Sequence, residues 1–305
     1  MITGANGFLG RNSILFFKQV FDEVVLVDRA PFNNRCTEGW HHDNLVYYAD
    51  LTTDIDVYRE LLADVDVVLH LANRARIDPS WTEYGDYYAT NITATQLFFE
   101  AAQRAGVKKF IHISSSSVYG NNGKIRQAES DPLMPTNPYA VSKMAGEWAL
   151  HVQSLKGDTE LVIVRPFTMY GDFMEDGRNA LVIQKFISAW EKGLPLLLHG
   201  GGDQRRDFIH VYDAVRGLLM ILEHGENGEV YNLGTGKSVT IKQLADVISN
   251  RQVKVPARPG AVSVTEADIT RLTEIGFEPM VNVIDWLTNI MQELKIKKLL
   301  QKESQ

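Results

Sequence analysis

The sequence has almost no cysteine and no long apolar run. Cys36 is the only cysteine among the 305 residues, so the chain can form neither an intramolecular disulfide nor a cysteine-based zinc site, and we expect a reducing compartment. The longest apolar stretches, such as 218–222, are far shorter than the roughly 18 residues that a membrane-spanning helix needs. No signal-peptide pattern opens the chain. We therefore expect a cytoplasmic protein that does not enter a membrane.

The sequence also has fewer basic than acidic residues. The 31 lysines and arginines stand against 38 acidic residues, and the formal net charge of −7 argues against sequence-independent binding to nucleic acid. An anionic ligand would therefore need local basic sites. The shares of 45% hydrophobic and 23% charged residues are ordinary for a globular protein and exclude an intrinsically disordered chain.

Short β-branched runs alternate with longer segments of helical spacing. The predicted strands are Val24–Val27, Val65–Leu69, Phe110–Ile113 and Leu161–Val164, and the predicted helices are Gly10–Phe21, Tyr87–Ala105 and Tyr139–Leu155. Apolar runs of this length, bounded by polar or turn residues, are typical of strands buried on both faces of a parallel sheet. The alternation predicts an α/β fold with a doubly wound parallel sheet, the Rossmann arrangement.

The pattern becomes irregular after Pro166, with glycine-rich turns between further helices. At roughly 150 residues per domain, the length suggests two domains. We expect a first domain over residues 1–168 and a smaller C-terminal α/β domain over 169–305. A segment near 229–234 is expected to return to the first sheet as a strand.

Three glycines lie at three-residue intervals at the start of the first predicted helix. Gly4 permits a tight turn, Gly7 lets the backbone approach a pyrophosphate, and Gly10 allows close packing of helix on strand. Asp28 ends the next apolar strand, where an acidic side chain would bind the adenosine ribose hydroxyls. The combination predicts a dinucleotide site. Since Asp28 would repel a 2′-phosphate, NAD is favoured over NADP, with Arg29 as the one contrary signal.

Tyr139 and Lys143 stand at positions i and i+4 of a predicted helix, on one face. A neighbouring cation and an oxidised nicotinamide would stabilise a tyrosine phenolate as a general base near neutral pH. Such a pair on its own is more often a solvated helix face. Here it follows a strand that ends in the serine run 114–117, at the sheet edge where such folds bind ligands.

Together these motifs resemble the extended short-chain dehydrogenase/reductases that act on nucleotide sugars, and most of all the UDP-sugar 4-epimerases. The resemblance is carried by the glycine loop, Ala49-Asp50-Leu51, His70-Leu71-Ala72, Asn91, the serine run, Tyr139 to Lys143, Arg165-Pro166-Phe167, Arg206 to Val211, and Arg258-Pro259-Gly260. It implies that the first domain binds NAD and that the second binds a nucleotide sugar, in a homodimer that pairs the 87–105 and 139–155 helices.

The resemblance also implies roles for single residues. Tyr139 would be the catalytic base, Ser115 its hydroxyl partner, and Lys143 the residue that holds the nicotinamide ribose. The implied cofactor-binding residues are Gly4, Gly7, Phe8, Leu9, Gly10, Asp28, Arg29, Asp50, Leu51, Leu71, Ala72, Asn91, Tyr139, Lys143 and Pro166. The implied substrate-binding residues are Ser115, Ser116, Tyr139, Thr168, Asn179, Arg206, Arg258 and Thr265, and no metal site is expected.

The serine run favours one reaction over its alternatives. Ser116 and Ser117 stand where relatives that eliminate water carry an aspartate and a glutamate. We therefore expect C4 epimerisation of a UDP-hexose or its N-acetyl form through a 4-keto intermediate, rather than a 4,6-dehydratase or a decarboxylase. A non-catalytic NAD-binding regulator is the alternative from another class, and we expect such a protein to lack Tyr139 or Lys143.

Overall fold

A computed structural model describes residues 1–29, 45–174, 180–257 and 262–303. Its largest element is a seven-stranded sheet in the order β11-β7-β5-β4-β1-β2-β3, in which every neighbouring pair is parallel. The strands are β1 (Ile2–Thr3), β2 (Val25–Asp28), β3 (Leu45–Tyr48), β4 (Val67–His70), β5 (Lys109–Ile113), β7 (Glu160–Pro166) and β11 (Val230–Leu233). The predicted doubly wound parallel sheet is confirmed. The strand order reverses between β1 and β4, and ligands bind outside the carboxyl ends at such a point.

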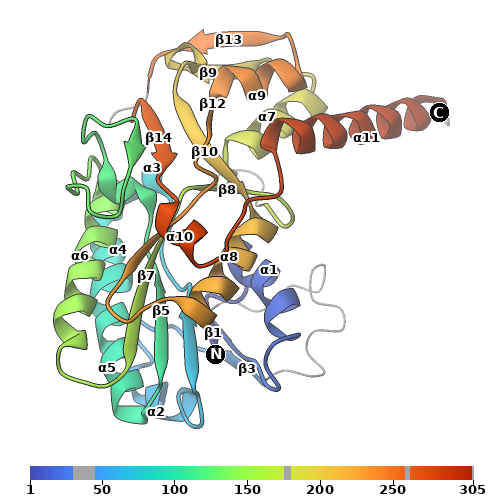
Figure 1. Ribbon diagram of the computed structural model, residues 1–305. Coiled ribbons are helices and arrows are strands. Elements are labelled where there is room, and N and C mark those ends of the chain that lie inside the picture. The colour runs from blue at the N-terminus through green and yellow to red at the C-terminus, as the bar shows by residue number, and fades with distance from the viewer. Residues whose placement is uncertain (30–44, 175–179, 258–261, 304–305) are drawn as a thin grey trace.

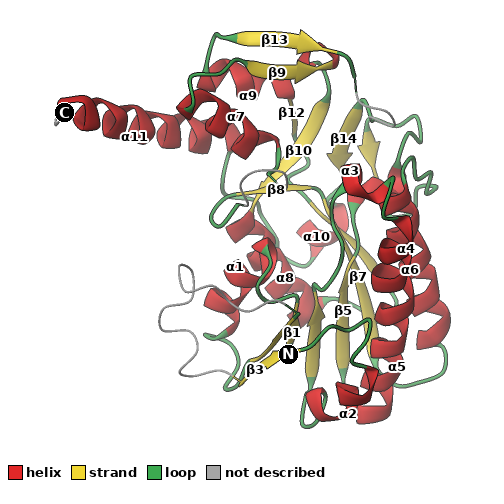
Figure 2. Ribbon diagram, turned by 180° about the vertical axis from the view of Figure 1, so that it is seen from behind, coloured by secondary structure: helices red, strands yellow, loops and turns green. Residues whose placement is uncertain are grey.

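Helices cover both faces of this sheet (Figures 1 and 2). On one face, α1 (Phe8–Phe17) and α8 (Val211–His224) bury an apolar cluster against the strands. On the other face, α2 (Tyr58–Leu61), α5 (Thr95–Ala105) and α6 (Pro138–Ser154) enclose a second cluster around Phe98, Phe99 and Phe110. With helices on both faces, the central strands are apolar on both sides, which explains their continuous apolar runs.

A smaller sheet with its own helices forms the upper part of the molecule in Figure 1. Its strands run in the order β12-β10-β14-β6, with β8 also paired to β10, and β13 pairs separately with β9. These strands are β6 (Arg126–Gln127), β8 (Thr168–Tyr170), β9 (Leu196–His199), β10 (Arg205–His210), β12 (Ser238–Thr240), β13 (Gln252–Val255) and β14 (Val264–Ala267). The helices are α7 (Val182–Glu191), α9 (Ile241–Ile248) and α11 (Val283–Glu303).

Shorter helical segments complete the described chain. They are η1 (Ile55–Val57), α3 (Ile77–Ser80), α4 (Tyr84–Tyr88), η2 (Ala89–Ala94), η3 (Ser116–Tyr119), η5 (Gly200–Gly202) and α10 (Thr270–Glu274). The expected single helix over 87–105 is divided, because η2 is a π-helical segment between α4 and α5. Within the described ranges, no helix combines the length and the apolar character needed to cross a membrane.

Candidate active site

A cleft of about 1630 Å³ lies at the carboxyl edge of the large sheet and reaches into the smaller part. Most of the residues that the sequence assigned to ligands line it together. They are Gly4, Gly7, Phe8, Leu9, Gly10, Asp28, Arg29, Asp50, Leu51, Leu71, Ala72, Ser115, Ser116, Tyr139, Pro166, Thr168, Arg206 and Thr265. Asn91 and Lys143 lie behind the cleft wall. Asn179 and Arg258, also expected at the substrate, lie outside the described residues.

The glycine loop leaves room for an anion next to the backbone. Gly4 has a φ of +65°, and a Cβ there would lie 2.7 Å from the backbone nitrogen of Ala72, so only glycine fits. Gly7 is the N-cap of α1 and supplies no side-chain cap, which leaves the first-turn amides available to a ligand. Uncapped amides at a helix N-terminus bind phosphate groups. This end of the cleft therefore fits the pyrophosphate of a dinucleotide.

The end of β2 is tied to the same loop. The backbone N–H of Asn6 donates to Oδ2 of Asp28 over 2.9 Å. Arg11, one turn into α1, donates from Nε to the backbone oxygen of Asn6 over 2.8 Å and to its Oδ1 over 3.1 Å. Both Asn6 and Arg11 line the cleft, and the sequence analysis missed them. Their positions within and directly after the glycine motif were the available signal.

The next two loops of the sheet close the other side of this region. Asp50 accepts hydrogen bonds from the hydroxyl and the N–H of Thr52, at 2.7 and 2.9 Å, and these bonds keep the pKa of its carboxyl below the usual value. After β4, the N–H of Ala72 donates to Oγ1 of Thr3 over 3.2 Å. The same hydroxyl contacts Nδ1 of His70 at 2.9 Å. The loops that follow β3 and β4 are thus held by short polar contacts.

Helix α6 presents Tyr139 to the cleft. The helix begins at Pro138, and the side chain of Asn137 caps it by accepting the N–H of Ala140 over 2.9 Å. Burial raises the pKa of Tyr139, and a hydrogen bond with Ser115 acts in the opposite direction. Ser115 itself caps η3 by accepting the N–H of Ser117 over 3.1 Å. The phenol and the serine hydroxyl are therefore fixed beside each other at the cleft wall.

Lys143 lies one turn further along α6 and is fully buried. Its Nζ donates to the backbone oxygen of Ile113, at the end of β5, over 2.5 Å. Burial lowers the pKa of Lys143 to about 7, and the carboxylate of Glu147 acts to raise it. The ammonium group thus changes its charge near neutral pH.

Asn91 lies in the π-helical segment and acts as a brace. Its Oδ1 accepts the N–H of Arg74 over 2.9 Å, and its Nδ2 donates to the oxygen of Arg74 and to Oγ of Ser142, at 3.0 and 2.9 Å. A Cβ added at Gly146 of α6 would lie 2.5 Å from the Asn91 backbone oxygen, so the two helical segments touch through their main chains. The amide of Asn91 therefore holds the loop after β4 against α6.

The smaller part contributes a half-buried cation to the cleft. Arg206 of β10 lies opposite Thr265 of β14 in the strand register. Its guanidinium donates to the backbone oxygens of Val262 and Arg205, at 2.6 and 2.7 Å. No carboxylate of the described residues pairs with it, and burial lowers its pKa to about 10. A guanidinium without a counter-charge in a cleft fits an anionic ligand such as a diphosphate.

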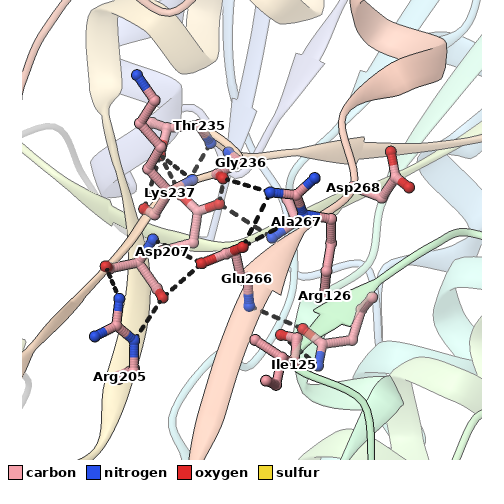
Figure 3. Close-up of polar contacts among 12 residues, drawn as sticks. Ile125, Arg126, Arg205, Asp207, Thr235, Gly236, Lys237, Glu266, Ala267 and Asp268 are labelled. Atoms are coloured by element: carbon pink, nitrogen blue, oxygen red, sulfur yellow. Dashed lines mark hydrogen bonds and ion pairs between the residues drawn. The ribbon is translucent and has the colours of Figure 1, made fainter.

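The next residue of β10, Asp207, fixes the position of this strand (Figure 3). Its carboxylate accepts the N–H and the hydroxyl of Thr235, at 2.9 and 2.7 Å, the N–H of Gly236 at 2.9 Å, and the N–H of Ala267 at 3.1 Å. These bonds join β10 to β14 and to the loop that follows β11. Arg206 and Thr265 are therefore held in register, at the junction with the large sheet.

The fold and the site are those of an α/β protein whose glycine loop fits a dinucleotide and whose Arg206 fits a second, anionic ligand across the same cleft. A family model described as "NAD dependent epimerase/dehydratase family" matches residues 1–234. The chain belongs to this family, and its cofactor is NAD, with which solved relatives were crystallised.

Individual relatives represent both branches of that family. The chain is 32% identical to a mouse (Mus musculus) dTDP-D-glucose 4,6-dehydratase over 80% of its length and 70% of that protein. It is 30% identical to the UDP-N-acetylglucosamine 4-epimerase of Methanobrevibacter ruminantium M1, with a TM-score of 0.86 and 97% of each chain covered. It is equally identical, at 30%, to the UDP-glucuronic acid 4-epimerase of Bacillus cereus in complex with UDP-glucuronic acid and NAD, with a TM-score of 0.84 and coverage of 96% and 98%.

Proposed function

We propose that the protein epimerises a UDP-sugar at C4. The observation that carries this choice is the loop beside Tyr139, where Ser115, Ser116 and Ser117 line the cleft with hydroxyl groups only. Tyr139 takes the proton of the C4 hydroxyl, and Ser115 orients the phenol and the sugar oxygen. Bound NAD supplies hydride acceptance from C4 and its return to the opposite face. The 4-keto sugar rotates in the cleft between these two steps. Tyr139 therefore takes the proton from one C4 epimer and returns it to the other.

The 4,6-dehydratase is the second candidate, because the chain is 32% identical to a dTDP-D-glucose 4,6-dehydratase. Elimination of water between C5 and C6 requires an additional acid and base next to the reacting carbons. Ser116 and Ser117 offer no carboxylate at this position. A serine hydroxyl is a poor proton donor at neutral pH, so the loop supports epimerisation better.

We assign the other cleft residues by the part of the substrate that each would meet. Arg206 would bind the diphosphate, together with Asn179 and Arg258, and Thr168 would contact the sugar. Thr265, across the β10–β14 pairing from Arg206, would border the C2 substituent. The assignment keeps the expected division into a cofactor domain at 1–168 and a substrate domain at 169–305, with β11 and α8 of the second range packed into the large-sheet part.

The decisive experiment is incubation of the NAD-loaded protein with UDP-, GDP- and dTDP-sugars, with products separated by stereochemistry. We expect a UDP-hexose or its N-acetyl form to yield its C4 epimer. A 4-keto-6-deoxy product found by mass spectrometry would instead assign the dehydratase. A protein that retains NAD and turns over none of these sugars would be the non-catalytic regulator.

We also propose that the protein is a homodimer formed by the α4–α6 side. Large apolar side chains of α6 and of its C-cap are exposed there: Trp148 at 60%, Val152 at 57% and the C-cap Leu155 at 75%. Tyr84 of the neighbouring α4 adds another at 57%. Exposed apolar side chains gathered on packed helices are typical of a protein–protein contact.

A further inference from the structure

A chain of buried polar groups runs behind the cleft wall, from α6 to β11 at the edge of the large sheet. Its centre is Glu147, which follows Tyr139 and Lys143 on the same face of α6 at four-residue intervals. Glu147 and its partner Arg165 of β7 form an ion pair of 2.6 Å, with both side chains 5% exposed. Neither residue lines the cleft, so neither can meet a substrate.

The carboxylate of Glu147 is bound from two strands. Arg165 donates to it from Nη2 over 2.6 Å and from Nε over 3.0 Å, which is a two-pronged contact. The hydroxyl of Ser114, at the end of β5, donates to the same carboxylate. Ser114 directly follows Ile113, whose backbone oxygen accepts the Lys143 ammonium. Glu147 and Lys143 of α6 therefore both bind the end of β5.

The remaining donors of Arg165 extend the chain to the smaller part. Its Nη1 donates to the hydroxyl of Tyr119 and to the backbone oxygen of Glu129, both at 3.0 Å. Tyr119 passes its own hydrogen to Oδ1 of Asn232 in β11 over 2.7 Å. All three nitrogens of the guanidinium thus have partners, which hold Arg165 in its place beside Glu147.

The buried charges around Lys143 leave Glu147 as its counter-charge. His70 of β4 and His112 of β5 also lie near the ammonium, and burial lowers the pKa of His70 to about 3 and that of His112 well below its usual value, which disfavours the charged form of both rings. Arg165 carries the same sign as Lys143. Glu147 is the group that raises the pKa of Lys143 against burial.

We propose that Glu147 is a positioning residue for the Tyr139–Lys143 pair, because its one carboxylate balances two buried cations, Lys143 and Arg165. Arg165 holds the carboxylate in place, and the carboxylate favours the protonated form of Lys143 against burial while its Nζ stays bound to Ile113. The catalytic consequence rests on the proposed function. The control of the Lys143 charge is a property of the protein alone and is measured without substrate.

The test is an NMR titration of the NAD-loaded protein carrying isotope-labelled lysine, with the Lys143 signal assigned from a Lys143→Arg variant. Glu147→Gln keeps the shape and removes the charge, so we expect the pKa of Lys143 to fall by about one unit or more, because a nearby opposite charge shifts a pKa by roughly 1–3 units. Ser114→Ala is the matched control. It removes a hydrogen bond from the same carboxylate but leaves the charge, so the pKa of Lys143 stays at the wild-type value.

Further variants separate charge from packing. Glu147→Asp restores a carboxylate on a shorter side chain and should return the pKa of Lys143 part of the way to the wild-type value. The double variant Glu147→Gln/Arg165→Gln is compared with Arg165→Gln alone, because both lack the guanidinium and differ only in the charge at position 147, and the pKa of Lys143 should be lower in the double variant. A wild-type pKa of Lys143 in Glu147→Gln, or equal pKa values of Lys143 in the double variant and in Arg165→Gln, overturns the proposal.

Turnover gives an independent comparison. We expect loss of the Lys143 proton to set the alkaline limb of the wild-type kcat–pH profile, and in Glu147→Gln this limb should move to lower pH while the KM for the sugar is kept. A purely structural role would lower kcat at every pH without moving the limb, and would also count against the proposal. Absence of turnover in wild type would refute the proposed function only, since the NMR titration still decides the role of Glu147.

Discussion

The carboxylate of Asp28 and the backbone N–H of Asn6 are joined by a 2.9 Å hydrogen bond across the mouth of the glycine loop. The bond places a negative charge at the end of β2, inside the cleft that would hold the adenosine ribose. One contact thus joins the loop that receives the pyrophosphate to the residue that selects between NAD and NADP.

We expect the protein to bind NAD at least about tenfold more tightly than NADP, because a 2′-phosphate beside a carboxylate costs several kcal/mol. Asp28→Asn keeps an oxygen for the N–H of Asn6 and removes the charge, so it should narrow this ratio. Isothermal titration with NAD and with NADP measures the ratio of the two affinities. Equal affinities in wild type would refute the role given to Asp28, and Arg29→Ala would then show whether Arg29 binds the phosphate.

Tyr139→Phe should lower kcat by about 10²–10⁴-fold, the usual contribution of a general base, and leave NAD bound. Only the hydroxyl that moves the proton is lost, and the ring remains buried. Stopped-time product assays measure kcat, and the absorbance of the purified variant measures how much NAD stays bound. Turnover close to the wild-type rate would remove Tyr139 from the mechanism.

Arg206 and Arg205 are adjacent on β10 and provide a matched pair. Arg206→Met should weaken UDP binding by about tenfold to a hundredfold, because hydrogen bonds to charged groups contribute about 1.5–3 kcal/mol. Arg205 points to the other side of the strand, where Nε donates to Oγ of Ser238 over 3.0 Å, so Arg205→Met should leave UDP affinity nearly unchanged. Equal losses in both variants would indicate a general loosening of β10.

Thr265 is expected to admit both the hexose and the N-acetylated substrate, because its side chain is small. Thr265→Tyr should depress turnover of the N-acetylated sugar selectively, since overpacking costs about 1–3 kcal/mol, or a roughly ten- to hundredfold loss. The quantity to compare is the ratio of kcat/KM for UDP-glucose and UDP-N-acetylglucosamine. If the ratio does not change, residue 265 does not border the C2 substituent.

A homodimer should be present at micromolar concentration in sedimentation velocity runs. Trp148→Glu places a charge among the exposed apolar side chains of α6 and should shift the protein to the monomer. Met280→Glu is the control, because Met280 is 74% exposed and lies outside the α4–α6 side. A wild-type monomer under these conditions would contradict the proposed assembly.

Much of the large sheet could be predicted because its signal is local. Strands such as β4 and β5 are buried on both faces, so they appear in the sequence as short apolar runs between helical segments. The π-helical segment could not be predicted, since the apolar spacing of 87–105 continues through it. The structure shows what this segment does: it places the buried amide of Asn91 where its hydrogen-bond partners lie, in the loop after β4 and in α6.

The same distinction applies to the candidate active site: its local motifs could be predicted from the sequence, and its contacts between distant segments could not. The glycine loop and the Tyr139–Lys143 pair are compact motifs, and the sequence indicated them directly. The contact of Arg165 with Glu147 spans 18 positions, and that of Tyr119 with Asn232 spans 113. Such contacts form only when the folded sheet brings distant segments together, so no local sequence pattern predicts them.

The main-chain contact between Gly146 and Asn91 has an evolutionary consequence. At this point α6 rests on a backbone oxygen and not on a side chain, so the contact takes nothing from the residues on the outer face of the helix. The outer face of α6, including Trp148 and Val152, can therefore mutate and acquire new partners while the phenol of Tyr139 stays in place. Position 146 is the exception, where even alanine would push the helix off its support.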